Sequence, residues 1–464
     1  MAFSQKINAS PANPDPVKMK QPDGKEVTVI LKGDENIKWM ESLDGYSLMY
    51  GKDNYVVYAV SNEKGDMVPS EVVFGETGLK STVSPAFLIS VKKGLRYSQS
   101  QIETFREIND VLKSSSVVPN LRATTGEAKA ICALIGFPDK PFAHTVDEFS
   151  QLMNQIGYSA NGAKGSVRDF YRENSYGKLE LIVTVVGPYT VSKESKYYGE
   201  NNGIQHDKNP GELAREAANF VFTDPIVDPS DYDNDNDGFI DTFHFLYAGY
   251  GEEAGGGSDC IWAHKSGFSS ALTFGTKKLN VYSCSPELRG NSGNNVTNIG
   301  VICHELCHVF GAPDYYDTDN EVGGEFVGTG TWDLMAQGSW NNGGISPAHI
   351  NMYQKIVFGW VTPVVLTEER NISGMLNSVE NPVAYTVQTT TPGEYFILEN
   401  RQKVKFDEYV RGHGLLIYRV SSQASGNKVD NRTHPQQVYP VCASSYISMP
   451  DSDPSSYGNI DSPG

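Results

Sequence analysis

Hydrophobic and polar positions alternate in short runs over the first part of the chain. Such runs occur at Val27–Leu31, Ser47–Tyr50 and Tyr55–Val60, and Asp-Gly pairs with other turn-forming residues separate them. Alternation with a period of two predicts strands that bury one face. Residues 1–88 are therefore expected to form a small β-rich module, and this module contains no cysteine.

Residues 89–127 change to a helical pattern. Apolar side chains recur at helical spacing within Gln99–Lys113, which predicts an amphipathic helix there. The segment after it, SSSVVPNLRATTGE, is rich in Ser and Thr and has no such pattern. A solvated linker and a proteolytic processing site are both compatible with this composition. We interpret 89–127 as a helix followed by an activation linker.

Strand and helix patterns are interspersed over residues 128–362, which predicts one larger domain of the α/β (α+β) class with a twisted sheet. Apolar runs indicate buried strands at Ala130–Phe137, Leu179–Val185 and Phe243–Tyr250. Helical spacing indicates helices at Val146–Ile156, Ser166–Tyr176, Gly211–Phe222, Asn298–Gly311 and Pro347–Phe358.

Strand patterns return after residue 362. The segments Ala384–Thr389, Tyr395–Glu399 and Gly414–Val420 predict a β-rich C-terminal domain over residues 363–464. The last residues, SDPSSYGNIDSPG, contain no evident terminating element. This favours a natural chain that continues past residue 464.

Composition and charge narrow the class of protein. With 39% hydrophobic residues, the 464-residue chain has enough apolar side chains for packed cores. A net charge of −18 argues against nucleic acid as a partner, because an acidic surface repels phosphates. No run of about 18 apolar residues occurs, so no transmembrane segment is expected. We expect a monomer.

The N-terminal sequence and the cysteines indicate the cellular compartment in which the protein functions. The start, MAFSQKINASPANPDP, lacks the apolar core of an export signal, and we expect that the signal of a secreted protein has been removed. Six cysteines permit up to three disulfides and fit an oxidising compartment. They have no CxxC spacing, which argues against a cysteine-based zinc site.

Two histidines in the segment VICHELCHVFGAPDYYD have the spacing of metal ligands. His304 and His308 lie four residues apart, which on a helix directs both imidazoles toward one ion. Glu305, beside them, is placed to take a proton from an attacking water. A chance pair of histidines on a solvated helix is the alternative, because HExxH alone is only moderately specific.

The residues that follow the histidines complete a zinc site. Gly311 can take the left-handed conformation that ends a helix, and Pro313 prevents the helix from resuming. Asp314 then offers an oxygen ligand beside the two histidines. The fourth coordination position of the zinc stays open. Met335 follows in a turn-rich stretch, as in the Met-turn of metzincins, with Asp in the place of the third His.

The segments HELCHVFGAPDYYD, GTWDLMAQGSW and KIVFGW together resemble the immune inhibitor A family of secreted bacterial metallopeptidases. The resemblance covers about residues 128–360 and is weaker in EYFILENRQ and GLLIYRV beyond them. It implies a metzincin-like endopeptidase that hydrolyses the peptide bonds of proteins. It also implies zinc-ligand roles for His304, His308 and Asp314, a general base at Glu305 and a structural Met-turn at Met335.

A pair of cysteines, Cys303 and Cys307, departs from the family pattern. Two cysteines four apart on a helix lie near the upper limit of disulfide reach, and their Cβ vectors are poorly aimed. We expect buried thiols or pairing elsewhere rather than a bridge between the two.

An acidic stretch from Asp233 to Asp241 has the spacing of an EF-hand-like calcium loop. Its expected ligands are carboxylates and one backbone oxygen, from Asp233, Asp235, Asp237, Phe239 and Asp241. His244 stands where the usual glutamate would be, so the loop is a shortened variant. A solvated acidic turn is the alternative, but alternating carboxylates repel one another without a cation. We therefore expect Ca²⁺ in a structural role.

The N-terminal module resembles the propeptide that members of the family carry, in QPDGKEV and LDGYSLMY. We expect it to inhibit its own enzyme, so that the protein is made as a zymogen. A thiolate switch is excluded because the module has no cysteine. Asp23 or Asp44 could ligate the metal instead, and an ordinary Asp-Gly turn is the alternative for both.

Together these features predict a secreted zinc metalloendopeptidase that acts on proteins or peptides, is made as a zymogen and is stabilised by calcium. Tyr315 or Tyr316 could steady the reaction's tetrahedral intermediate, and His264 could line the cleft. One alternative is a calcium-dependent extracellular binding protein with a degenerate protease domain. Another is a thermolysin-type enzyme, whose third zinc ligand is a more distant glutamate.

Overall fold

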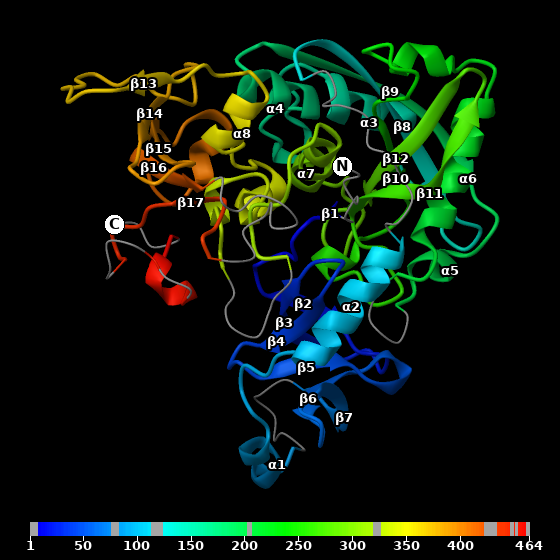
Figure 1. Cartoon of the computed structure of the whole chain (residues 1–464). Coiled ribbons are helices and arrows are strands. Elements are labelled where there is room, and N and C mark those ends of the chain that lie inside the picture. Colours follow the sequence, from blue (N-terminus) through cyan, green and yellow to red (C-terminus); the bar gives the residue numbers. More distant parts are fainter. Residues whose placement is uncertain are drawn as a thin grey trace.

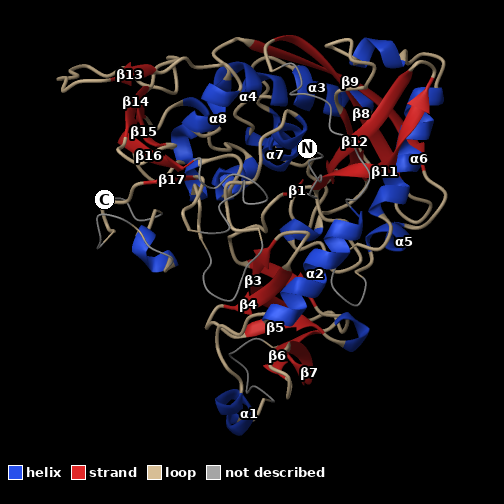
Figure 2. Ribbon diagram, in the orientation of Figure 1, coloured by secondary structure: helices blue, strands red, loops and turns tan. Residues whose placement is uncertain are grey.

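Three sheets organise the chain in the computed structural model (Figures 1 and 2). The residues that it describes are 8–75, 83–112, 124–201, 207–318, 326–421, 434–445, 450 and 453–460, with side chains for all but 106–112 and 454. Most of the expected activation linker, 113–123, lies outside the described residues.

The N-terminal sheet has six strands in sequential order, each antiparallel to the next. The strands are β2 (Val17–Lys20), β3 (Glu26–Gly33), β4 (Lys38–Ser42), β5 (Ser47–Tyr50), β6 (Val56–Ser61) and β7 (Met67–Val73). Two helices follow, α1 (Pro85–Ser90) and α2 (Gln99–Leu112). Ile102 and Phe105 of α2 pack against Trp39 and Met49 of this sheet, so the predicted amphipathic helix covers one of its faces.

The central sheet has the strand order β1-β11-β12-β10-β8-β9. Its strands are β1 (Asn8–Ala9), β8 (Gly126–Gly136), β9 (Leu179–Thr190), β10 (Phe243–Tyr247), β11 (His264–Phe274) and β12 (Lys277–Pro286). Strands β8, β9, β10 and β12 are parallel, whereas β11 is antiparallel to β12 and β1 is antiparallel to β11. The N-terminal strand thus closes the edge of a sheet that is otherwise built from much later residues.

Helices cover both faces of the central sheet (Figure 1). Along β8, Cys132 and Leu134 face α3 (Val146–Asn154), α4 (Val167–Asn174) and α7 (Ile299–Val309). The intervening Ile131 and Ala133 face α6 (Pro210–Thr223) on the other side. This alternation explains why the sequence of β8 is a continuous apolar run, because a strand that is covered on both faces buries side chains on both of them.

The third sheet lies at the C-terminal end, in the order β13-β14-β15-β16-β17. Its strands are β13 (Val364–Leu366), β14 (Tyr385–Gln388), β15 (Glu394–Arg401), β16 (Gly414–Ser421) and β17 (Val438–Pro440). Helix α8 (Met352–Val357) precedes it, and α5 (Ser195–Gly199) is a short helix of the central domain. This arrangement confirms the predicted α/β (α+β) class with β-rich flanks.

The six cysteines are all free thiols, so none of the permitted disulfides forms. Cys303 and Cys307 are fully buried in α7, as expected, and burial raises the pKa of both thiols well above its ordinary value. Within the described residues, no helix is both long enough and apolar enough to cross a membrane.

Candidate active site

Helix α7 carries the HExxH segment through the interior of the molecule, and every one of its residues is buried. It packs closely on the 3₁₀ segment Gln337–Gly344, because a Cβ atom at Gly300 would lie 2.0 Å from the Ser339 carbonyl oxygen. The helix ends just before Gly311, whose φ of 101° is the left-handed value expected from the sequence. The chain then turns back and brings Asp314 toward the helix.

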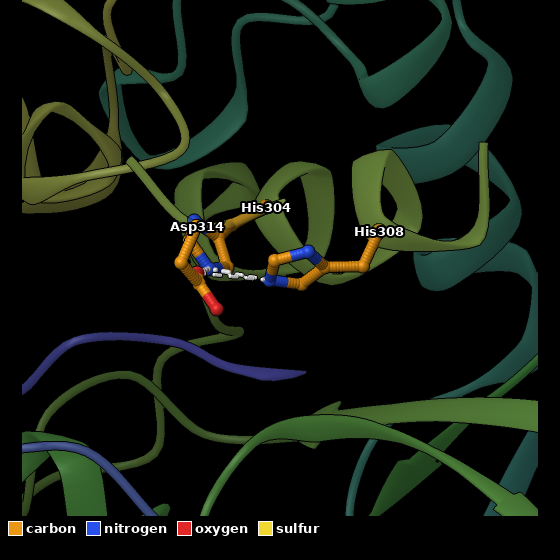
Figure 3. Close-up of side chains that lie close together, drawn as sticks. All are labelled: His304, His308 and Asp314. Carbon is orange, nitrogen blue, oxygen red and sulfur yellow. Dashed lines mark hydrogen bonds and ion pairs between the residues drawn. The ribbon is translucent and has the colours of Figure 1, made fainter. Parts of the chain in front are cut away.

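His304, His308 and Asp314 converge on one point (Figure 3). The two Nε2 atoms lie 3.0 Å apart, and each is 3.2 Å from Oδ1 of Asp314. The Nδ1 atoms face away and contact the carbonyl oxygens of Leu334 and Ala312, each at 2.8 Å. These outer contacts hold both rings so that Nε2 faces the common point.

This donor set fits a metal ion. Two imidazole nitrogens and one carboxylate oxygen are buried around the same point, which is the composition of catalytic sites that keep one position open. Burial works against the charge on Asp314, yet His308 and His304 hold the pKa of this carboxyl below its usual value. The carboxylate is therefore ready to bind a cation.

Glu305 lies beside the three converging side chains with its carboxylate fully buried. Neither of its oxygens has a hydrogen-bond partner among the described residues. Burial and the nearby carboxylates of Asp314 and Glu253 raise its pKa well above the ordinary value. An uncommitted carboxylate next to the metal position is the group that a water-activating base requires.

The Met-turn lies beneath the histidines. Met335 is fully buried, and its carbonyl oxygen accepts the N–H of Tyr315 at 2.8 Å. Its neighbour Leu334 supplies the carbonyl that holds His304. The turn thus links the first histidine to the segment that carries Asp314.

Of the two tyrosines considered, Tyr316 reaches the site and Tyr315 does not. The Tyr316 hydroxyl donates to the carbonyl oxygen of Ala9 at 2.7 Å and lies 3.1 Å from Asp34. The Tyr315 hydroxyl donates to Gln354, away from the metal position. His264 pairs with Ala9 across the sheet edge, and its buried imidazole contacts the Trp262 carbonyl oxygen and the Tyr282 hydroxyl.

The N-terminal segment fills a cleft between strand β11 and His308, which the sequence did not indicate. Strand β1 pairs antiparallel with β11, and Ser10 N–H donates to the Ala263 carbonyl oxygen at 3.3 Å. The side-chain amide of Asn8 lies 2.9 Å from Nδ1 of His308. The Ser10 N–H also faces Glu305 and lowers the pKa of that carboxyl against the effect of burial. In Figure 3 the blue N-terminal strand passes below the three labelled side chains.

Asp23 and Asp44, proposed above as metal-binding residues of the N-terminal module, both lie on exposed turns. Asp23 pairs with Lys25 at 2.7 Å and Asp44 with Lys93 at 3.8 Å, so neither faces the metal position. The carboxylate of the module that does approach is Asp34, which contacts Tyr316; burial, Asp314 and Asp34 together raise the pKa of the Tyr316 hydroxyl. Burial and Asp314 raise the pKa of Asp34 itself to about 7. Both residues precede a glycine with positive φ, Gly24 and Gly45, which agrees with the alternative of ordinary Asp-Gly turns.

The acidic loop lies apart from the cleft and has a folded, turn-like geometry. Carboxylate oxygens of Asp233, Asp235 and Asp237 come within 4.8 Å of one another. Asp233 is buried, accepts the backbone N–H groups of Asp237 and Gly238, and pairs with Lys277 at 2.5 Å. Asp241, also predicted as a ligand, accepts the backbone N–H of Asn234 at 2.6 Å.

A buried HExxH helix, an aspartate that converges with its two histidines and a buried glutamate beside an edge strand are typical of a metal-dependent peptidase domain. Comparison with known proteins agrees. The family described as immune inhibitor A peptidase M6, catalytic domain, matches residues 144–360. Residues 144–360 of the chain are thus similar to the catalytic domain of the immune inhibitor A family of metallopeptidases.

Two relatives illustrate the extent of the similarity. The pre-pro-metalloprotease PrtV of Vibrio cholerae serotype O1 (strain M66-2) is 30% identical over 272 residues, which cover 49% of this chain and 29% of PrtV. Immune inhibitor A of Bacillus thuringiensis subsp. alesti is 27% identical over 246 residues, which cover 45% of this chain and 34% of the relative. The similarity thus spans about a third of the length of these relatives.

Proposed function

We propose that this protein is a secreted zinc endopeptidase that hydrolyses the peptide bonds of proteins. The observation that carries the proposal is the convergence of His304, His308 and Asp314 on one point beside the uncommitted carboxylate of Glu305. Hydrolysis of casein by the full chain, compared with that by its Glu305→Gln variant, tests it. A calcium-dependent binding protein with a degenerate site is less well supported, because ligands and base are all present and buried.

Each of these residues has a distinct role in the proposed reaction. Zn²⁺, when held by the two histidines and Asp314, supplies a Lewis acid that polarises the scissile carbonyl and acidifies the attacking water. Glu305 takes the proton of that water and delivers it to the leaving amine. Tyr316 donates its hydroxyl to the carbonyl oxygen that becomes negative, as it now does to Ala9. Strand β11 aligns an extended substrate by antiparallel pairing, as it now aligns Asn8–Ala9.

We further propose that the N-terminal module keeps the enzyme latent. Its first strand lies where an extended substrate would pair with β11, and its Ala9 carbonyl takes the hydrogen bond of Tyr316. The Trp262 indole N–H also donates to the Ser10 carbonyl oxygen at 2.8 Å. Hydrogen bonds from Tyr316 and Trp262 therefore hold two successive carbonyl groups of the segment. A tethered segment has an effective concentration in the millimolar range, so a Kd of ~0.1 mM would block about nine sites in ten.

We expect casein hydrolysis by the full chain to rise by at least about tenfold after cleavage between residues 89 and 127, because cleavage removes this effective concentration. Mass spectrometry locates the cut, and the casein assay is run on the same samples. The Glu305→Gln chain is the control, since it should not process itself and should stay inactive when another protease cuts it. Full activity of an intact chain would contradict the proposal.

A calcium ion at the acidic loop is the third part of the proposal. The cluster of Asp233, Asp235 and Asp237 supports it, because Lys277 alone offsets only one of three neighbouring carboxylates. Asp235 and Asp237 are exposed, so their oxygens are accessible to an ion from solvent. The proposed role is structural, since the loop lies outside the cleft.

Calcium at about a hundredfold its Kd is expected to raise the melting temperature of the central domain, residues 128–362, by about 5 °C or more, since binding to the folded state alone adds about 2.7 kcal/mol. Differential scanning fluorimetry in calcium and in EGTA, with zinc kept in excess, measures this difference. The double change Asp235→Asn and Asp237→Asn should abolish it. Asp231→Asn, an exposed aspartate next to the loop, should leave it intact. Equal melting temperatures of the unaltered chain in both buffers would refute a calcium site.

A further inference from the structure

A second cluster of buried charges lies next to the cleft and is not explained by the reaction. Carboxylate oxygens of Glu35, Asp207 and Glu252 lie within 4.8 Å of one another, and all three residues are buried. Lys38 enters this cluster from the N-terminal module, with its Nζ 2.5 Å from Glu252 and 3.3 Å from Glu35. Asp207 and Glu252 belong to the peptidase domain, whereas Glu35 belongs to the same module as Lys38. The cluster is therefore a pocket of the peptidase that holds a lysine side chain from the module.

Trp262 joins this pocket to the cleft. The Lys38 ammonium lies 5.1 Å from the centre of its ring, a cation–π contact. The backbone N–H of Trp262 donates to Oδ2 of Asp207 at 3.0 Å, while its indole N–H donates to the Ser10 carbonyl oxygen at 2.8 Å. One residue thus forms a wall of the charged pocket and also a contact of the peptide segment in the cleft.

The pocket gathers three carboxyl groups around the single ammonium of Lys38. Oδ1 of Asp207, a residue that is 94% buried, has no hydrogen-bond partner among the described residues. Burial and Glu35 raise the pKa of Asp207 well above its ordinary value, and burial raises that of Glu252 to about 7 despite Lys38. Glu252, Glu35 and Asp207 raise the pKa of Lys38 although burial opposes this. A cation is what such a site favours, and the ammonium takes the place that a metal ion would need.

The direction of the bound segment fixes which part of a substrate would meet the pocket. The Ala9 carbonyl oxygen accepts the Tyr316 hydroxyl at 2.7 Å, as the carbonyl of a cleaved bond would, so Ser10 and the residues after it follow the cleaved bond. Those residues pass Trp262 and then Glu253, whose carbonyl oxygen accepts the N–H of Asn13 at 2.9 Å. A side chain from this stretch of a substrate would therefore lie beside Asp207 and Glu252.

We propose that Asp207, Glu252 and Trp262 form a subsite for a lysine or arginine side chain of the substrate, within three residues after the cleaved bond. In the latent chain Lys38 fills this subsite, and removal of the module takes away Lys38 and Glu35 together. The inference rests on the proposed peptidase function. It adds a substrate class, proteins with basic residues on the C-terminal side of the cut.

Peptides that differ at one position test the subsite. The full chain, incubated until its activity is constant, is assayed on fluorogenic peptides with Lys, Met or Glu at each of the three positions after the cleaved bond. Mass spectrometry confirms that all peptides are cut at the same bond. At one position kcat/KM for Lys should exceed that for Met by about tenfold, and Glu should be poorest, because a desolvated cation pairs with two carboxylates and a ring. Met is the neutral control of similar length.

Variants then locate the preference. Glu252→Gln and Asp207→Asn, each alone, should lower the Lys-to-Met ratio toward one. Glu212→Gln, an exposed glutamate on the rim of the adjoining cavity of about 440 Å³, should keep the ratio of the unaltered chain. Hydrolysis of the Met peptide shows that each variant is folded.

Three outcomes separate this inference from the function on which it rests. No hydrolysis of any peptide would contradict the peptidase itself. Hydrolysis with equal rates for Lys and Met in the unaltered chain would overturn the subsite alone, and this holds even if a variant fails to fold. A Lys preference that survives both single substitutions would place the specificity elsewhere and also overturn it.

Discussion

The Glu305→Gln chain is expected to hydrolyse casein about 10²–10⁴-fold more slowly than the unaltered chain, the range that a positioned general base contributes. The amide has almost the shape of the carboxylate but cannot accept the proton of the attacking water. Because Glu305 is not among the three converging ligands, the metal content should stay the same. Initial rates on casein and metal analysis of the same samples measure both quantities.

Two comparisons show whether a loss of activity is due to the missing base. Glu212→Gln, at an exposed position of α6, should leave the rate unchanged and controls for the loss of one negative charge. A Glu305→Gln chain that retains its rate would remove Glu305 from the mechanism. If the unaltered chain binds metal but cleaves nothing, even after processing, the binding-protein alternative would be favoured.

The metal site was predictable because its residues are close in sequence and their geometry is local. A helix places His304 and His308 on one face whatever surrounds it. Gly311 and Asp314 follow shortly after His308 in the sequence, at the turn that ends this helix. Strands β3, β5 and β6 of the N-terminal sheet and most elements of the central domain were also predicted to within a few residues, since their periodicity reflects burial on one or two faces.

The walls of the cleft were not predictable in the same way. Strand β11 is polar and half exposed, with an irregular register between Gly267 and Leu272, so it has no clear alternation. The two-residue strand β1 has no periodicity at all, and it forms only because β11 offers an unpaired edge. Such long-range pairing cannot be inferred from local patterns.

The charged pocket could not be predicted from local sequence patterns either. Glu35, Lys38, Asp207 and Glu252 come from three distant stretches of the chain, and none is near a recognisable motif. Only the docking of the N-terminal module onto the peptidase brings them together. Its main signal in the sequence is the acidic pair Glu252-Glu253, which by composition alone suggests a solvated turn.

Asp314→Ala is expected to lower zinc affinity by more than about 100-fold, because loss of a direct ligand should exceed the 10–100-fold cost of losing an outer partner. Asp314 is the carboxylate whose oxygen lies 3.2 Å from both histidine nitrogens. Its loss leaves two imidazoles, which cannot complete the three-ligand set of a catalytic site. Competition with a chromophoric chelator measures the affinity, and casein hydrolysis at saturating zinc measures what activity remains.

Asp34→Asn is the matched control, since Asp34 is buried near Asp314 and contacts Tyr316 but is not one of the converging ligands. It removes a neighbouring negative charge without removing a ligand, so zinc affinity should change by less than about tenfold. A large loss in both variants would mean that overall charge, and not coordination, governs binding. Full zinc affinity in Asp314→Ala would favour the thermolysin-type alternative, in which a more distant glutamate completes the site. The short connection from His308 through the left-handed Gly311 to Asp314 argues for the nearer carboxylate, because it places the Asp314 oxygen 3.2 Å from both imidazoles.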